Sequence, residues 1–422
     1  METSCSSHME GPASPETHVF FVVNPMSKGG SAGKKWPPLF ADLQGIILRG
    51  EGTARCCLRV WTLETSGPGD ATQLVRQKLR EYADPQFQPA ASLVVMVAVG
   101  GDGTINEVAN GFFHPVVDLL GPPEELGRLI CNRSAMACFN FGTGGDFTKT
   151  VPCPQDMEEL YEMLAEQDPT LMVDVGLCTF VPLDSEEVTD CYYTMCREGE
   201  CDFEKSKARA PESRYFVNVA TAGMAAETCF QAEKVKGCCC GGKIAYYWAI
   251  VKSLYHFRNK DLLVKLDGGE PRLLEQVSCF SCGNGCYFGD GLPVCPSANP
   301  IDGKLTTTVW TKARVRDFIF NTRAMYSGDH VKADTTVVME GKKFEVSSQR
   351  EENLCLVEAD GEILGRLPAT YQVLPERLPI LTPALHKLLQ KFQGGVDRSE
   401  SSLRQGEGYE SSSSWSSSSC HT

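Results

Sequence analysis

The sequence lacks a hydrophobic run long enough to cross a membrane as a helix. Its most apolar stretches, residues 93–99 and 244–254, are shorter than the roughly 20 residues that a spanning helix requires. Residues 1–17 are polar and lack the apolar core of a secretory signal. We therefore expect a cytoplasmic protein whose contact with any membrane is peripheral.

The sequence also lacks an excess of positive charge. Its 40 lysines and arginines are outnumbered by 54 aspartates and glutamates, so the formal net charge is −14. Surfaces that bind nucleic acid or adhere broadly to anionic lipid depend on basic residues. We therefore expect no nucleic-acid partner, although local basic patches are compatible with this composition.

Cysteine is abundant, but the arrangement that a structural zinc site needs is missing. In a chain expected to be cytoplasmic, the 20 cysteines are expected to be reduced, and many of them to be small core residues. Cys279, Cys282 and Cys286 have metal-like spacing, yet no second cysteine or histidine pair lies at zinc-finger distance. Zinc is therefore the less favoured interpretation.

Three adjacent cysteines, Cys238, Cys239 and Cys240, lie in a glycine-rich stretch beside Lys234 and Lys236. An exposed loop with reduced thiols is the favoured interpretation. S-acylation, which would aid membrane contact, is the alternative hypothesis.

The order of the predicted elements indicates a parallel α/β domain followed by a β-rich domain. Before residue 168, apolar strands typical of a buried parallel sheet alternate with helices: strands at 19–23, 55–63 and 93–99, helices at 70–82 and 105–113. From residue 171 onward, many short strands separated by turns predict an antiparallel sandwich or barrel. The expected domains are residues 18–168 and 169–382.

The remaining segments have compositions that do not fit either domain. Residues 1–17 are predicted to be a disordered leader, 383–393 a terminal helix, and 394–422 a disordered tail rich in serine. Within the second domain, the charged stretch near 184–212 and the glycine- and lysine-containing stretch near 227–242 are predicted to be insertions.

The glycine-rich loop of residues 100–104, Gly-Gly-Asp-Gly-Thr, is the strongest local signal for chemistry. It follows an apolar strand and precedes a predicted helix, so phosphate oxygens can approach backbone N–H groups at the positive end of that helix. Asp102 would act there through a metal ion or close to a reacting hydroxyl. A tight turn without a ligand is the alternative, and five matching residues behind a buried strand favour the phosphate site.

Two further loops share this character. Asn24, Pro25, Ser27 and Gly29 follow the first strand, and residues 141–147 form another glycine-rich loop that carries Asp146. Loops at the carboxyl ends of parallel strands converge, so the three loops are expected to meet.

In this order, the motifs resemble the family of diacylglycerol kinases, sphingosine (long-chain-base) kinases and ceramide kinases, which share one catalytic domain. The resemblance runs from about residue 18 to about residue 382, without the two insertions. It implies an N-terminal α/β nucleotide-binding domain, similar to that of NAD kinases, then a C-terminal antiparallel β-sandwich and an active site between them. Beyond the three loops, the matching segments are 65–71, 105–111, 174–176, 218–223, 242–246, 296–305 and 357–362.

The resemblance also implies ATP and Mg²⁺ as cofactors and assigns roles to individual residues. Asp102, Asp146 and Asp174 match carboxylates linked to the catalytic Mg²⁺ and its waters. The positions that match contacts to ATP are Asn24, Pro25, Ser27, Thr65, Gly101, Asp102, Gly103, Thr104, Asn106, Glu107 and Thr143. A structural metal site is matched by Asn299, Asp302 and the Lys304 carbonyl.

Two carboxylates compete for the role of base. Glu362, which follows Asp360 in a predicted turn, matches the position proposed as proton acceptor, whereas some family members assign that role to the residue matching Asp102. Asp360 is grouped with them as a catalytic candidate. Such carboxylates suit phosphoryl transfer, which needs positioning, charge neutralisation by Mg²⁺ and a proton acceptor.

The sequence therefore predicts a lipid kinase that transfers the γ-phosphate of ATP to a hydroxyl of diacylglycerol or of a sphingoid long-chain base. NAD kinase, which shares the 100–104 loop, is the alternative enzyme, and residues 142–144 and the turn before Glu362 argue against it. A non-catalytic lipid-binding protein of the same fold is the second alternative. The expected partners are the lipid and the membrane surface, and a homodimer stays open.

Overall fold

The computed structural model describes residues 16–50, 57–84, 86, 91–114, 127–166, 170–183, 209–235, 252–253, 257–312, 323–349, 355–383, 385 and 388. The chain divides into two compact units, Met1–Pro383 and Ala384–Thr422. All elements discussed below belong to the first unit. Among the described residues, no helix combines the length and the apolar character that spanning a membrane would require.

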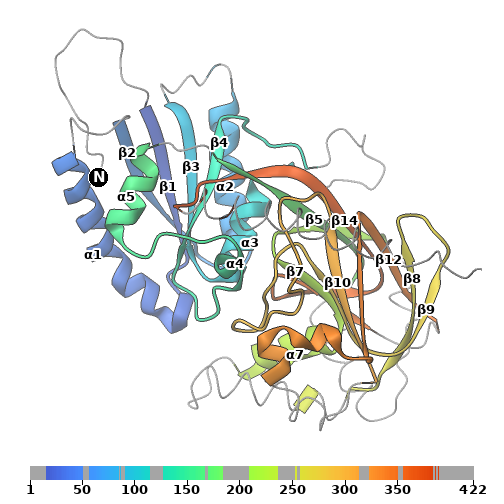
Figure 1. Cartoon of the computed structure of the whole chain (residues 1–422). Coiled ribbons are helices and arrows are strands. Elements are labelled where there is room, and N and C mark those ends of the chain that lie inside the picture. Colours follow the sequence, from blue (N-terminus) through green and yellow to red (C-terminus); the bar gives the residue numbers. More distant parts are fainter. Residues whose placement is uncertain are drawn as a thin grey trace, which may run out of the picture. The chain divides into compact units, whose positions relative to one another are not determined.

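Four parallel strands form the sheet of the N-terminal α/β domain, in the order β4-β3-β1-β2 (Figure 1). They are β1 (Glu16–Val23), β2 (Cys57–Glu64), β3 (Ala91–Gly100) and β4 (Ser134–Asn140). The connecting helices are α1 (Ser27–Gly50), α2 (Asp70–Ala83), α3 (Asp102–Gly111), α4 (Asp146–Thr150) and α5 (Met157–Glu166).

Both faces of this sheet are covered, which explains the continuous apolar runs of β1 and β3. Alternate residues of a strand point to opposite faces. Val19 and Phe21 of β1 pack with Trp36 of α1 and Leu160 of α5 on one face. The other face is covered by α2 and α3, which pack against each other and against β3.

The described residues of the second, antiparallel domain form ten strands. They are β5 (Leu171–Pro182), β6 (Glu212–Phe216), β7 (Val219–Gly223), β8 (Lys260–Leu266), β9 (Arg272–Gly283), β10 (Leu305–Thr311), β11 (Thr336–Gly341), β12 (Lys343–Ser348), β13 (Leu356–Ala359) and β14 (Glu362–Ile380). Their pairings include a closed ring, β9-β7-β13-β14-β12-β8, that returns to β9. The predicted succession of a parallel α/β domain and an antiparallel β-rich domain is confirmed.

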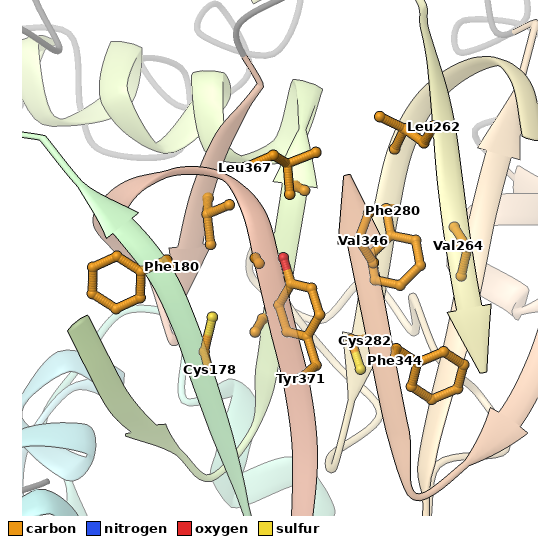
Figure 2. Close-up of a cluster of buried hydrophobic side chains, with 14 of the residues drawn as sticks. Cys178, Phe180, Leu262, Val264, Phe280, Cys282, Phe344, Val346, Leu367 and Tyr371 are labelled. Carbon is orange, nitrogen blue, oxygen red and sulfur yellow. The ribbon is translucent and has the colours of Figure 1, made fainter. Parts of the chain in front are cut away.

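The core of the β-rich domain lies inside this ring (Figure 2). Inward-facing side chains alternate along the strands, as the two-residue period of a strand requires. Phe280 and Cys282 of β9, Phe344 of β12 and Tyr371 of β14 are all completely buried there. Several cysteines thus act as small core residues, as the composition predicts.

Strand β14 joins the two domains. It pairs with β13, β12 and β5 in the β-rich domain, and its last residue, Ile380, pairs in parallel with Met136 of β4. A single sheet of 14 strands therefore runs through both domains. This shared sheet fixes the β13–β14 turn relative to the loops of the α/β domain.

Two segment boundaries differ from the sequence expectation. Strand β1 begins at Glu16 and Thr17 is fully buried, so the predicted leader contributes its last two residues to the sheet. The predicted insertion at 227–242 begins inside helix α7 (Met224–Val235), where Glu227 and Thr228 are buried. The glycines and lysines of this stretch suggested an insertion, whereas packing against β7 and β13 makes its first part a helix.

For the other predicted segments, the structure offers nothing to compare with the prediction. Most of the 184–212 insertion, Cys238, Cys239 and Cys240, all but a few residues of the 383–393 helix, and the serine-rich tail lie outside the described residues.

Candidate active site

The loops that follow β1, β2, β3 and β4 line one cavity of about 1180 Å³. They meet because parallel strands end at the same edge of the sheet. The opposite wall comes from the β-rich domain, mainly from the turn between β13 and β14. The lining residues are Asn24, Met26, Ser27, Lys28, Thr65–Gly69, Ala71, Gly101–Thr104, Glu107, Gly142–Gly144, Leu183, Arg214, Phe230 and Asp360–Ile363.

Glycines allow two of these loops to pack backbone against backbone. The N–H groups of Phe141 and Gly142 donate to the Gly100 carbonyl, over 2.8 and 3.1 Å. A Cβ on Gly142 would lie only 2.6 Å from the Gly101 Cα. Side chains at these positions would therefore separate the 100–104 loop from the loop after β4.

The loop after β1 begins with an unusual backbone. Lys28, Gly29 and Gly30 have φ values of 53°, 65° and 81°, in the left-handed region that glycine tolerates best. This turn places Ser27 and Lys28 on the cavity wall. Asn24 is tied to the 100–104 loop, because its Nδ2 donates to Thr104 Oγ1 over 3.2 Å.

Asp102 and Asp146 approach each other across Gly144. A Cβ built on Gly144 would lie 3.1 Å from Asp102 Oδ2 and 3.5 Å from Asp146 Oδ2. Burial, and then the charge of Asp146, raise the pKa of Asp102, while the Phe147 N–H that donates to Asp102 Oδ1 opposes this. Lys149 Nζ lies 2.8 Å from Asp146 Oδ1 and partly balances the pair.

This pair fits a magnesium ion that also binds a substrate. Mg²⁺ commonly takes one or two carboxylates and completes its octahedron with phosphate oxygens and waters. Within the described residues, no cluster of three or more acidic, histidine or cysteine ligands occurs, so a protein-only cage is not formed there. Asp102 and Asp146 would hold such an ion only together with a nucleotide.

The structure does not bring Asp174 to this cavity. Asp174 is fully buried, and its carboxylate accepts hydrogen bonds from the N–H groups of Gly303 and Glu376, over 2.7 and 2.8 Å. The expected network of Asp102, Asp146 and Asp174 is thus not assembled. Asp174 does not belong to any of the loops that line the cavity. It lies in β5, in the antiparallel domain.

Asp174 lies instead beside the residues matched to a structural metal site. Its N–H donates to the Pro300 carbonyl, and burial together with the Asp174 charge raises the pKa of Asp302 to about 6. Asp302 Oδ1 accepts from the Lys304 N–H, and Asn299 Oδ1 accepts from the Ile301 N–H. Two neighbouring carboxylates suit a cation, and a metal site at Asn299, Asp302 and Lys304 stays a prediction.

The turn between β13 and β14 presents Glu362 to the cavity. Asp360 and Gly361 have φ values of 50° and 88°, as in the two-residue type I′ turns that suit hairpins. A Cβ on Gly103 would lie 3.8 Å from Glu362 Oε1, so this carboxylate faces the 100–104 loop. Arg214 Nη2 lies 2.6 Å from Glu362 Oε2.

Asp360 has a different environment from Glu362, although both line the cavity. Only 7% of Asp360 is exposed, and burial raises its pKa to about 6 against the effect of its hydrogen bonds. Its two oxygens accept from Val217 N, Asn218 N, Val219 N and Asn106 Nδ2. Because these donors occupy the carboxylate, Asp360 holds the turn in place. A direct catalytic role of Asp360 stays a prediction.

Two residues expected to contact ATP form hydrogen bonds with other residues of the protein. Asn106 is fully buried and does not line the cavity; it binds Asp360 and Arg214. Glu107 lines the cavity, but its carboxylate accepts from Gly69 N and Ala71 N and so caps the start of α2. Of the other residues expected to contact ATP, Pro25 does not line the cavity. Those that do line it are Asn24, Ser27, Thr65, Gly101, Asp102, Gly103, Thr104 and Thr143.

The sequence reasoning missed several lining residues, of which Arg214 is the most important. Arg214 lies two residues after the predicted insertion near 184–212, and the signal that could have marked it is its place directly before the largely apolar run of 215–220. Leu183, Phe230 and Ile363 were also missed, because each is an ordinary apolar residue in its own segment. Together they add apolar side chains to the cavity lining.

Comparisons with known proteins match both domains. Residues 18–178 match the model of the diacylglycerol kinase catalytic domain, and residues 218–382 match that of the YegS C-terminal NAD kinase beta sandwich-like domain. Proteins named diacylglycerol kinase from Staphylococcus carnosus (strain TM300) and Staphylococcus haemolyticus (strain JCSC1435) are 23% and 24% identical to this chain over 321 and 324 residues. Each alignment covers 76% of this chain, and 83% and 77% of the respective relative.

A solved structure shares the fold. It belongs to a protein of Bacillus anthracis str. Sterne proposed to be a diacylglycerol kinase, with a TM-score of 0.54 and 19% identity, and the alignment covers 87% of this chain and 98% of that one. The two family models follow each other in the same order as the two domains described above. Residues 18–178 therefore belong to the diacylglycerol kinase catalytic-domain family.

Proposed function

We propose that this protein is a lipid kinase that transfers the γ-phosphate of ATP, with Mg²⁺, to the hydroxyl of a diacylglycerol or of a sphingoid long-chain base. One observation carries the proposal: a single cavity sets the phosphate-binding loop of residues 100–104 opposite the carboxylate of Glu362. Phosphoryl transfer between a nucleotide and an alcohol needs these two elements face to face.

The α/β wall would bind the nucleotide. Backbone N–H groups of Gly101 and Gly103, at the start of α3, suit phosphate oxygens, and Ser27 and Lys28 add a hydroxyl and a positive charge. Asp102 and Asp146 would hold Mg²⁺, which when bound neutralises charge on the phosphates. Asp102 would therefore be occupied by the cation, which favours Glu362 over Asp102 as the base.

Glu362 would accept the proton of the lipid hydroxyl. As the O–H bond breaks toward the carboxylate, the hydroxyl oxygen forms a bond to the γ-phosphorus, and the bond from that phosphorus to the bridging oxygen breaks to release ADP. A carboxylate that faces the phosphate loop is placed for this step. Asp360 supports it indirectly, because it fixes the turn that carries Glu362.

The apolar side chains in the cavity lining support a lipid as the acceptor. Leu183, Phe230 and Ile363 line the same cavity as Glu362 and come from the segments of the β-rich domain. Apolar lining with a few directed polar groups is typical of sites for apolar ligands, whereas the acceptor of an NAD kinase is polar. A lipid acceptor also requires peripheral contact with a membrane. Whether the protein forms a homodimer is a separate prediction.

The test is a transfer assay with the purified full chain, ATP labelled in its γ-phosphate and Mg²⁺. Diacylglycerol, sphingosine and ceramide are presented in mixed micelles, and NAD in solution. We expect label in diacylglycerol or the sphingoid base, lost when EDTA removes Mg²⁺ and lost in Glu362→Gln. Label in NADP alone would show an NAD kinase. Binding to lipid micelles without any transfer would support the non-catalytic alternative.

A further inference from the structure

Arg214 occupies a position between two parts of the cavity that belong to different domains. Its side chain is 29% exposed and lines the cavity from β6. One end of the guanidinium contacts Glu362, where Nη2 lies 2.6 Å from Oε2. The same guanidinium contacts Asn106 of α3, with Nη2 and Nε 2.9 and 3.2 Å from Asn106 Oδ1.

Asn106 is a rigid anchor for this arginine. It is fully buried, and its Nδ2 donates to Asp360 Oδ2 and to the Tyr215 carbonyl, over 2.8 and 3.0 Å. These two acceptors fix the amide so that its oxygen points at Arg214. Arginine suits such a bridge, because its planar fork offers several donors in a fixed geometry.

The anchor lies on the helix that also carries the phosphate loop. Helix α3 begins at Asp102, and Asn106 follows four residues later, one turn into the same helix. The distance between the 100–104 loop and Arg214 is therefore set by a rigid helical turn. Glu362 itself has a flexible side chain that is 31% exposed, so it needs a partner to keep one orientation.

We propose that Arg214 is a positioning residue that ties Glu362 to helix α3 and thereby keeps the carboxylate in register with the phosphate loop. This inference rests on the proposed function, in which Glu362 is the proton acceptor. The pair itself contributes little to stability, since ion pairs that are open to solvent are weak. Its effect is on geometry, where a displacement of about 1 Å can reduce the rate by about 100-fold.

Steady-state kinetics of Arg214→Gln test this role. We expect kcat to fall about 10- to 100-fold, while KM for ATP changes less than about threefold, because the nucleotide-binding loops are untouched. Arg214→Lys keeps the charge but not the fork, so it should restore part of kcat. A raised KM for ATP with normal kcat would show that Arg214 binds nucleotide, and would overturn the proposal.

A double-mutant cycle separates positioning from a general structural role. Glu362→Asp keeps a carboxylate but shortens it by one methylene, so it breaks the contact with Arg214 while leaving turnover measurable. In that background, Arg214→Gln should cost less than about threefold, because the contact is already lost. Losses that multiply would show that Arg214 acts independently of Glu362.

Arg76→Gln is the matched control. Arg76 Nη2 donates to the Asn110 carbonyl of α3 over 3.1 Å, so it joins the same helix but contacts neither Glu362 nor the cavity lining. We expect kcat within about twofold of the wild type. Similar melting temperatures of the two glutamine variants would show that the loss in Arg214→Gln does not come from unfolding.

A crystal structure of Arg214→Gln gives a readout that needs no substrate. Glu362 should leave its place opposite Gly103 or occupy several conformers. If it kept a single, unchanged position, the positioning role would be refuted whatever the enzyme's substrate. If Glu362 moved but the wild type phosphorylated no lipid, the positioning role would hold and the proposed function would fail.

Discussion

The two walls of the cavity use acidic residues in different ways. On the α/β side, Asp102 lines the cavity and Asp146 lies close enough to repel it, and burial raises the pKa of Asp102 further. On the β-rich side, Asp360 lines the cavity and accepts four hydrogen bonds, and the buried Glu358 behind it accepts two, from Gly361 N and Thr221 Oγ1. The first arrangement favours binding a cation, whereas the second builds the turn that carries Glu362.

This difference teaches that position in the same cavity does not give the same role. Glu362 and Asp360 are separated by one residue, yet one faces the phosphate loop and the other is used up by backbone N–H groups. Like charges kept close together cost stability and are retained for function, while carboxylates whose oxygens are all occupied by donors support the fold. Each prediction below tests one side of this distinction.

The largest expected effect is on catalysis, in Glu362→Gln. Glutamine keeps the shape but cannot accept the proton, so kcat should fall about 100- to 10,000-fold. The free energy of unfolding should change by less than about 1 kcal/mol, because both side chains of the ion pair with Arg214 are open to solvent, 29% and 31% exposed. Transfer assays measure kcat, and urea unfolding measures the free energy of unfolding. A large loss of stability would show that Glu362 supports the fold, as Asp360 does.

Asp360→Ala should have the largest effect on stability. It removes the acceptor for three buried backbone N–H groups and for Asn106, so the free energy of unfolding should fall by about 3–5 kcal/mol. Urea unfolding followed by circular dichroism measures this. If the variant were as stable as the wild type but inactive, Asp360 would have a direct role in the reaction.

Glu358 should make stability depend on pH. Burial raises its pKa to about 8 from an ordinary value near 4.5, so the folded protein holds a proton that the unfolded chain releases. Stability is then complete below about pH 4.5 and falls as the pH rises toward 8. Glu358→Gln should reduce that fall by more than about 1.4 kcal/mol, the value of one pKa unit.

The measurement for Glu358 is urea unfolding at several pH values from 5 to 8.5. Glu345→Gln is a suitable control, because Glu345 is a surface residue paired with Lys343 and Lys265. If the stability of the wild type and of Glu358→Gln depended on pH in the same way, the buried carboxyl of Glu358 would not be the cause of the fall in stability.

The smallest expected effect is a gain in stability from Asp102→Asn. The amide removes the repulsion with Asp146 and the cost of burying a charge, so the free energy of unfolding should rise by about 0.5–2 kcal/mol, while transfer activity is lost. Thermal unfolding without Mg²⁺ measures the gain. A variant less stable than the wild type would show that Asp102 supports the fold as Asp360 does.

Much of the α/β wall could be predicted from residues that are neighbours in the sequence. Residues 100–104 follow a strand and begin a helix, so the geometry of the loop is local, and the parallel strand order then brings the loops together. Asp174 shows the opposite case. A carboxylate at a strand was grouped with Asp102 and Asp146, but its partners, Gly303 and Glu376, are more than 120 residues away in the chain.

The sequence by itself determined the order of the two domains, the apolar strands buried on both faces, and the glycine loops, because each depends on a local pattern of side-chain size and polarity. Only the tertiary structure decided which carboxylates face the cavity. Asp360 is occupied by Val217–Val219 and Asn106, and Glu362 is joined to α3 by Arg214, because β14 brings distant segments into one sheet. No local pattern encodes those contacts.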